Sequence, residues 1–117
     1  MQLNEIHHVS INVKDVEAAE QFYVGVLGLQ ALERPDLGFP GIWLQVGRQQ
    51  IHLMKLDFDV PVKEQHFAFH VDDIEAIRAE LKQSGVPLTE SREIPGACLQ
   101  AFTHDPSGNM IEFNQPL

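Results

Sequence analysis

The chain has 117 residues, of which 44% are hydrophobic and 21% are charged, with a formal net charge of -9 and one cysteine, Cys98. This composition is typical of one globular domain without an intrachain disulfide. The acidic balance argues against nucleic acid or a membrane as a partner, because both attract basic surfaces. No apolar run approaches the roughly 20 residues that span a bilayer, and no signal peptide is evident, so we expect a cytoplasmic protein.

The first half of the chain predicts a strand, a helix and three short strands. Residues 8–13 alternate between polar and apolar side chains, which is typical of a strand with one face on a core. The helix that follows should begin after Asp15, a capping residue, and end at Gly28. The three short strands are predicted at 30–33, 42–46 and 50–55.

The second half repeats this pattern. Residues 66–77, HFAFHVDDIEAI, align with residues 8–19, HVSINVKDVEAA, and residues 110–113, MIEF, align with residues 50–53, QIHL. The second helix should begin after Asp73 and end at Gly85, and strands are predicted at 88–92, 98–104 and 110–114. We therefore predict an α+β fold of two tandem βαβββ modules in one domain, 1–117, with module one at 1–57, a linker at 58–64 and module two at 65–117.

Four potential metal ligands fall on matching positions of this repeat. His8 and His66 begin equivalent strands, and His52 and Glu112 occupy equivalent positions near the module ends. Strand alternation places all four on the face opposite the core, so they can converge if the two sheets curl around a shared concavity. Three imidazoles and a carboxylate suit one ion of Zn, Ni, Co, Mn or Fe. The alternative is a repeat that kept these residues without binding metal.

Other side chains on this face are candidates for contacts with a substrate. A substrate pocket lined by Trp43, Gln45, His70, Gln100 and Phe102 is predicted. For Trp43 the alternative is a core position. Candidates for binding an anionic substrate group are Arg34, Arg48, Lys55 and Arg92, although isolated surface arginines are commoner. His7 should point to the opposite face by strand alternation.

The motifs 8–15, 22–29, 66–73 and 105–113 resemble those of the vicinal oxygen chelate superfamily, which includes glyoxalase I, methylmalonyl-CoA epimerase, fosfomycin-resistance thiol transferases and extradiol dioxygenases. The resemblance implies paired βαβββ modules that form an incomplete barrel around a metal. It also implies that His8, His66 and Glu112 are ligands. His52 stands where glyoxalase I carries a glutamate that is both ligand and catalytic base.

We therefore expect a divalent-metal-dependent enzyme, with glyoxalase-I-like isomerisation of a small oxygen-chelating substrate as the first hypothesis. Glu112 would transfer the proton, with His52 as the alternative base. Thiol transfer to an epoxide and ring-cleaving oxygenation are the alternative reactions. A non-catalytic binding or resistance protein is the alternative of a different class. The superfamily often builds its site across a dimer interface, so the resemblance also implies a homodimer.

Overall fold

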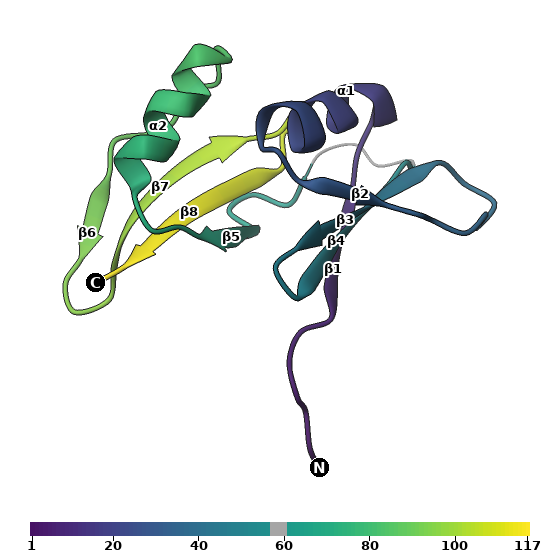
Figure 1. Cartoon of the computed structure of the whole chain (residues 1–117), viewed down its shortest axis with the longest axis horizontal. Helices are drawn as coiled ribbons and strands as arrows, with labels where there is room; N and C mark the ends of the chain where they lie inside the picture. The colour runs from purple at the N-terminus through teal and green to yellow at the C-terminus, as the bar shows by residue number, and fades with distance from the viewer. Residues whose placement is uncertain (57–60) are drawn as a thin grey trace. The chain divides into compact units, whose positions relative to one another are not determined.

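The computed structural model describes residues 1–56 and 61–117, which form two compact units, unit 1 (Met1–Pro61) and unit 2 (Val62–Leu117) (Figure 1). Each unit holds one four-stranded sheet and a helical segment after its first strand, as predicted for an α+β fold of two βαβββ modules. Residues 57–60, where the first module was predicted to end and the linker to begin, lie outside the described residues. Within the described residues, no helix is long and apolar enough to cross a membrane.

The sheet of unit 1 has the strand order β1-β4-β3-β2. Strand β1 runs parallel to β4, and the remaining pairs are antiparallel. His8 lies opposite Gln50, and Ser10 lies opposite His52, so His52 is diagonal to His8 on the neighbouring strand. The elements of unit 1 are β1 (His8–Asn12), α1 (Val16–Glu20), η1 (Gln21–Val26), β2 (Gln30–Leu32), β3 (Gly41–Val46) and β4 (Gln49–Met54).

The helix of unit 1 begins with a side-chain cap and changes type before it ends. Asp15 Oδ1 accepts a hydrogen bond from the backbone N–H of Glu17 at 2.9 Å, as its predicted capping position requires. The sequence predicted one continuous α-helix, but α1 passes into the π-helix η1, where the Leu27 N–H donates to the Phe22 carbonyl five residues back. The wider turn accommodates two adjacent buried aromatic residues, Phe22 and Tyr23, whose rings pack edge to face at 5.1 Å.

The sheet of unit 2 repeats the arrangement with the order β5-β8-β7-β6. His66 lies opposite Met110, and Ala68 lies opposite Glu112, so Glu112 is diagonal to His66 as His52 is to His8. The elements of unit 2 are β5 (His66–His70), α2 (Ile74–Gln83), β6 (Arg92–Ile94), β7 (Cys98–His104) and β8 (Met110–Pro116). The repeat seen in the sequence is therefore a repeat of strand register.

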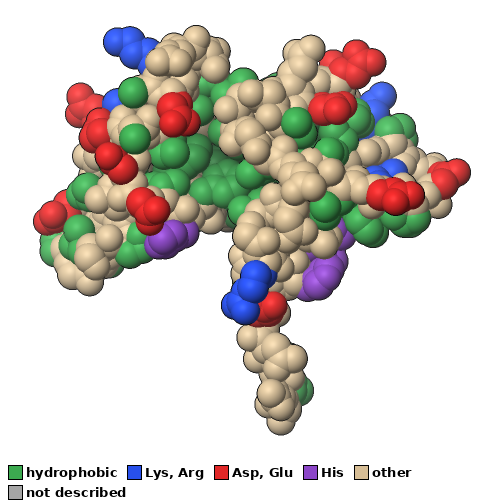
Figure 2. Space-filling model, in the orientation of Figure 1, with side chains coloured by type: hydrophobic (Ala, Val, Ile, Leu, Met, Phe, Trp, Pro, Cys, Tyr) green, Lys and Arg blue, Asp and Glu red, His purple; other side chains and the backbone are tan. Residues whose placement is uncertain are grey.

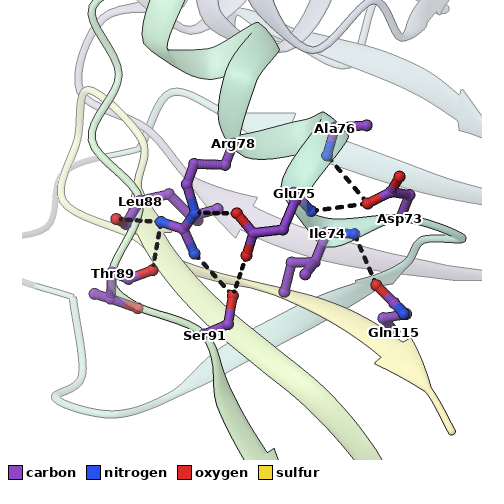
Figure 3. A network of polar contacts seen from close by, with 9 residues as sticks. All are labelled: Asp73, Ile74, Glu75, Ala76, Arg78, Leu88, Thr89, Ser91 and Gln115. Atoms are coloured by element: carbon purple, nitrogen blue, oxygen red, sulfur yellow. Dashed lines mark hydrogen bonds and ion pairs between the residues drawn. The ribbon is translucent and has the colours of Figure 1, made fainter.

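The prediction of a strand at 88–92 was wrong, because β6 starts only at Arg92. The carbonyls of Leu88 and Thr89 accept hydrogen bonds from Arg78 Nη1 at 3.0 and 2.9 Å (Figure 3). These carbonyls therefore bond to a helix side chain instead of a neighbouring strand. The strand propensity of residues 88–92 gives no information about a hydrogen-bond donor on α2.

Arg78 also joins a second part of this network. Its Nε donates to Glu75 Oε2 at 2.9 Å, and its Nη2 donates to Ser91 Oγ at 2.8 Å (Figure 3). Ser91 Oγ in turn donates to Glu75 Oε1 at 2.9 Å. The hydrogen bonds from Ser91 and then from Arg78 lower the pKa of the Glu75 carboxyl. The network fastens α2 to the segment that leads into β6.

Each sheet has one apolar face, which forms the core of its unit. Burying one large aliphatic or aromatic side chain stabilises a fold by roughly 1.5–3 kcal/mol, so this face supplies most of the stability of each unit. The opposite face is left for polar side chains. The buried core residues of the sheets and helices include Phe22, Tyr23, Leu44, Ile51 and Leu53 in unit 1, and Ile74, Leu81, Ala101, Ile111 and Phe113 in unit 2.

Candidate metal centre

In unit 1 the two predicted ligands lie against each other on the polar face of the sheet. The imidazoles of His8 and His52 are stacked, with ring centroids 4.0 Å apart and an angle of 15° between their planes. Trp43, opposite His52 on β3, stacks on the same imidazole at 4.2 Å and 6°. His52 is only 8% exposed, although it belongs to the polar face. Its burial comes from the two rings that contact it.

The environment of His52 favours a neutral imidazole. Burial lowers the pKa of His52, and the neighbouring charges of His8, His7 and Arg34 lower it further. The Nε2 atom lies 2.8 Å from Gln50 Oε1, an amide oxygen that can only accept a hydrogen bond. His52 therefore carries its proton on Nε2, and Nδ1 holds the lone pair that a metal or a proton would use.

His7 does not lie where strand alternation placed it. His7 lies just before the first residue of β1, and its carbonyl accepts a hydrogen bond from the Gln50 N–H at 3.0 Å. Instead, His7 Nδ1 is 2.9 Å from His8 Nδ1, and the two rings meet edge to face at 5.2 Å. With Nδ1 of His8 engaged in this contact, Nε2 is the nitrogen of His8 that remains for a metal.

In unit 2 the predicted ligands His66 and Glu112 are also in contact. His66 Nε2 lies 3.1 Å from Glu112 Oε1. His66 Nδ1 donates to the backbone carbonyl of Glu64 at 2.8 Å, so Nε2 is the ring nitrogen that meets the carboxylate. Asn114 Nδ2 donates to Glu112 Oε2 at 2.8 Å and fixes the orientation of a carboxylate that is only 6% exposed.

Two of the predicted pocket residues touch predicted ligands directly, and they occupy equivalent positions. Trp43 pairs with His52 across the strands of unit 1, and Phe102 pairs with Glu112 in unit 2. The Phe102 ring also meets the His66 ring edge to face at 5.5 Å. In each unit an aromatic side chain therefore borders the ligand pair.

The other predicted pocket residues lie farther from the ligand pairs. His70 and Gln100 both pair with Asn114, one row of side chains beyond Glu112. Gln45 Nε2 donates to the carbonyls of Gly47 and Gln49 at 2.7 and 3.1 Å, so this side chain holds the β3–β4 turn.

Each unit contributes two of the four predicted ligands. Across residues 1–56 and 61–117, no group of three or more His, Cys, Asp or Glu side chains is gathered closely enough to hold a metal ion. The single four-ligand site thus stays a prediction. What the structure describes is one histidine pair and one histidine–glutamate pair with the same strand register.

Three residues around these pairs were not assigned a role from the sequence. Gln50 and Asn114 each lie two residues from a predicted ligand on the same face, a spacing that could have identified them. Glu64 has a left-handed backbone with φ of 67°, and its carbonyl holds His66. No sequence pattern indicates that conformation, because glutamate rarely adopts it.

Comparison with known proteins shows the family of the chain. The model of the glyoxalase/bleomycin resistance protein/dioxygenase superfamily matches residues 5–113. An Arabidopsis thaliana protein named "Glyoxylase I 4" is 30% identical over 96% of this chain and 71% of its own length. A Vibrio parahaemolyticus protein named "Probable lactoylglutathione lyase" is 30% identical over 98% of this chain and 93% of its own length.

Solved structures agree with the sequence comparison. The crystal structure of a glyoxalase family protein from Enterococcus faecalis superposes with a TM-score of 0.83 at 30% identity, and the match covers 97% of this chain and 99% of that one. The family model covers far more than half of the chain. The chain therefore belongs to the glyoxalase/bleomycin resistance protein/dioxygenase superfamily, the vicinal oxygen chelate proteins.

Proposed function

We propose that this protein is a divalent-metal-dependent enzyme with glyoxalase-I-like chemistry, and that His8, His52, His66 and Glu112 together hold one metal ion. The observation that carries the proposal is the equivalence of the two pairs. The His8 and His52 rings stack at 4.0 Å, and His66 Nε2 lies 3.1 Å from Glu112 Oε1, with the same diagonal register in each unit. Each unit thus brings two potential metal donors together on one face of its sheet, which supports the proposal of a common ion.

The donor atoms suit a borderline divalent cation. His66 holds its Nδ1 proton on a backbone carbonyl, so its Nε2 is available as a ligand. The lowered pKa of His52 favours the neutral imidazole that a metal requires. Asn114 steadies the Glu112 carboxylate from its second oxygen. Zn, Ni, Co, Mn and Fe all accept such a nitrogen and oxygen set.

The proposed reaction is the isomerisation of a hemithioacetal formed from a 2-oxoaldehyde and a thiol. When bound, the ion would polarise two vicinal oxygens of the substrate and stabilise the negative charge that develops on them. Glu112 would take the proton from the carbon that bears sulfur and return it to the neighbouring carbon. The hydroxyl proton would pass from the oxygen of the first carbon to the oxygen of the second, which yields a 2-hydroxy thioester. His52 would be the alternative base. The names of the Arabidopsis and Vibrio relatives support this reaction class.

Metal content and turnover test the proposal together. The protein would be stripped with a chelator and titrated with Zn, Ni, Co, Mn and Fe(II), and each loaded form would be assayed with methylglyoxal and glutathione. We expect about one ion per chain, and a loss of at least about ten-fold in metal affinity for His8→Ala and Glu112→Ala. The control is His104→Ala, an exposed histidine outside both pairs. Less than about 0.1 ion per chain after metal-replete growth would reject the metal site.

Turnover separates the enzyme from a binding protein. Stoichiometric metal without turnover on the hemithioacetal, on an epoxide with a thiol, or on a catechol would support a non-catalytic binding or resistance protein. Turnover on an epoxide with a thiol would support thiol transfer instead, and turnover on a catechol would support ring cleavage. In either case the metal ligands would stand and the glyoxalase reaction would be rejected.

We also propose that the protein is a homodimer in solution, as many members of the superfamily are. Light scattering on the metal-loaded protein tests this point. A stable monomer with a full complement of metal would reject the dimer, and it would also exclude a site shared between two chains.

A further inference from the structure

Arg34 lies beside the predicted ligands of unit 1. It lies two residues after Leu32, the last residue of β2, and Leu32 pairs with Trp43. A Cβ added to Gly41 would come within 3.0 Å of Arg34 Nη2 and 3.1 Å of its Cζ, so the guanidinium lies directly over Gly41. Gly41 is two residues before Trp43 on the same face of β3. Arg34 is therefore one row of side chains beyond the row that holds His52.

The described contacts of the Arg34 side chain include the loop that follows it. Its Nη2 donates to the Phe39 carbonyl at 3.0 Å, and its Cζ lies 5.0 Å from the centroid of the Phe39 ring. Its Nε is buried and has no hydrogen-bond partner in the part of the chain that the structure describes. No carboxylate there forms an ion pair with it. A half-buried cation without a counterion is unfavourable unless an anion joins it.

Among the described residues, the strands of unit 1 place no carboxylate on the face that carries the predicted ligands. The chain has 17 acidic and 8 basic residues, and acidic side chains are spread over the visible surface of both units (Figure 2). The strand residues that share the ligand face of unit 1 are nevertheless all non-acidic: His8, Ser10, Asn12, Gln30, Leu32, Gly41, Trp43, Gln45, Gln50, His52 and Met54. These strands therefore set no negative charge beside Arg34, and this leaves their ligand face suited to an anion.

The internal repeat places an arginine at the matching position of unit 2. Arg92 pairs with Gln100, and Gln100 pairs with Asn114, one row beyond the row of Glu112. Arg92 is exposed, whereas Arg34 is half-buried with its Nε unsatisfied. The recurrence supports a functional reason for a cation in this row, and burial singles out Arg34 as the better candidate.

We propose that Arg34 binds a carboxylate of the substrate, and that the substrate is a small oxygen-chelating compound with a carboxylate remote from its chelating oxygens. This inference rests on the proposed function for the chelating oxygens, but the anion site itself requires only unit 1. Two residues along a strand span about 6.6 Å, which sets the separation between the carboxylate and the ligand row. A guanidinium suits this role because it presents several N–H groups to a carboxylate in a fixed plane.

Trp43 supplies a reporter for the test. It is the only tryptophan of the chain, and it stacks on His52 next to the row of Arg34. Its fluorescence would be followed in the whole protein, metal-free and metal-loaded, during titration with 2-oxoglutarate. The matched probe is 2-oxopentanoate, which has the same carbon chain and chelating oxygens without the remote carboxylate.

Three variants complete the experiment. Arg34→Gln removes the charge, and Arg34→Lys keeps the charge without the planar fork. The control Lys82→Gln removes an exposed charge from α2 of unit 2. We expect the dissociation constant for 2-oxoglutarate to rise at least about ten-fold in Arg34→Gln and less in Arg34→Lys. Lys82→Gln should bind 2-oxoglutarate as the wild type does, and all forms should bind 2-oxopentanoate equally.

The results separate the two proposals. Unchanged 2-oxoglutarate binding in Arg34→Gln, no binding by the wild type in either metal state, or an equal loss for both probes in Arg34→Gln would overturn the role of Arg34. A loss as large in Lys82→Gln would overturn it as well. If the protein takes up no metal but Arg34 still discriminates between the probes, the anion site stands and the proposed function fails.

Discussion

The imidazole of His52 lies parallel to that of His8, with ring centroids 4.0 Å apart. The two residues are 44 positions apart in the sequence, yet the parallel pairing of β1 with β4 brings them together diagonally. Trp43 closes the other side of His52, so the ring has little room to turn. A ligand held in this way loses little conformational freedom when it binds an ion.

The residue type at position 52 should determine how tightly a metal binds. We expect His52→Leu to weaken metal affinity by at least about ten-fold, because it removes one ligand and keeps the apolar contact with Trp43. His52→Glu, which introduces the residue that glyoxalase I carries there, should retain an affinity within about ten-fold of the wild type. Competition with a coloured chelator measures both. Equal affinity for the wild type and His52→Leu would remove His52 from the ligand set.

The pKa of His52 makes a prediction about stability and pH. Burial lowers this pKa in the folded protein below the ordinary histidine value of 6.5. As the pH falls through 6.5, the unfolded chain therefore takes up a proton that the folded chain refuses. We expect the metal-free protein to lose stability between pH 7.5 and about pH 5.5. The control His52→Gln should lose less over this range in urea unfolding experiments, and an equal loss would contradict the prediction.

The sequence predicted the positions of the ligand pairs because strand alternation and an internal repeat are local patterns. The alternation of side chains along each strand is enough to place both members of a pair on one face. It does so for His8 with His52 and for His66 with Glu112. The same alternation placed His7, which precedes the first residue of β1, on the opposite face. Strand alternation therefore did not predict the contact of His7 with His8.

Contacts between distant segments explain the other failures. Arg78 donates to the Leu88 and Thr89 carbonyls, which a strand at 88–92 would have used for pairing. Nothing in residues 88–92 indicates a hydrogen-bond donor on α2. The position of the Arg34 guanidinium over Gly41, with a hydrogen bond to the Phe39 carbonyl, is likewise not indicated by any local pattern. Such features depend on tertiary structure, which a propensity cannot anticipate.

The left-handed turn at Glu64 should be necessary for the position of His66. Its φ of 67° points the carbonyl at His66 Nδ1. This conformation costs a residue with a side chain about 1–2 kcal/mol and is hardest for a β-branched one. We expect Glu64→Val to lower both the unfolding free energy and the metal affinity. Glu64→Gly should preserve both, because glycine adopts this backbone without strain.

Calorimetric titration of metal, together with urea unfolding, measures the two effects in the same samples. The pair of variants separates backbone conformation from the loss of the Glu64 carboxylate, since both remove that side chain. If Glu64→Gly weakened the metal as much as Glu64→Val did, the carboxylate and not the turn would be responsible.

The Arg78 network should contribute more to the unfolding free energy than an ordinary surface ion pair does. Arg78 reaches two backbone carbonyls, a hydroxyl and a carboxylate that belong to separate segments of unit 2. We expect Arg78→Met to lower the unfolding free energy by about 1–2 kcal/mol, because the methionine keeps the aliphatic contact but leaves these acceptors without their donor. Lys82→Met, an exposed position on the same helix, is the control and should change it little.

The pH dependence of this difference tests the cause. Hydrogen bonds from Ser91 and then from Arg78 lower the pKa of Glu75 below its ordinary 4.5. The hydrogen bond to the Glu75 carboxylate therefore contributes stability above pH 4.5, and this contribution is lost as the pH falls through the lowered pKa. The gap between the wild type and Arg78→Met should therefore narrow below about pH 4.5 but not close, because the bonds to the carbonyls of Leu88 and Thr89 do not titrate. A gap that vanished would show that the ion pair alone is responsible, whereas a gap independent of pH would show that the carbonyl bonds alone hold the segment to α2.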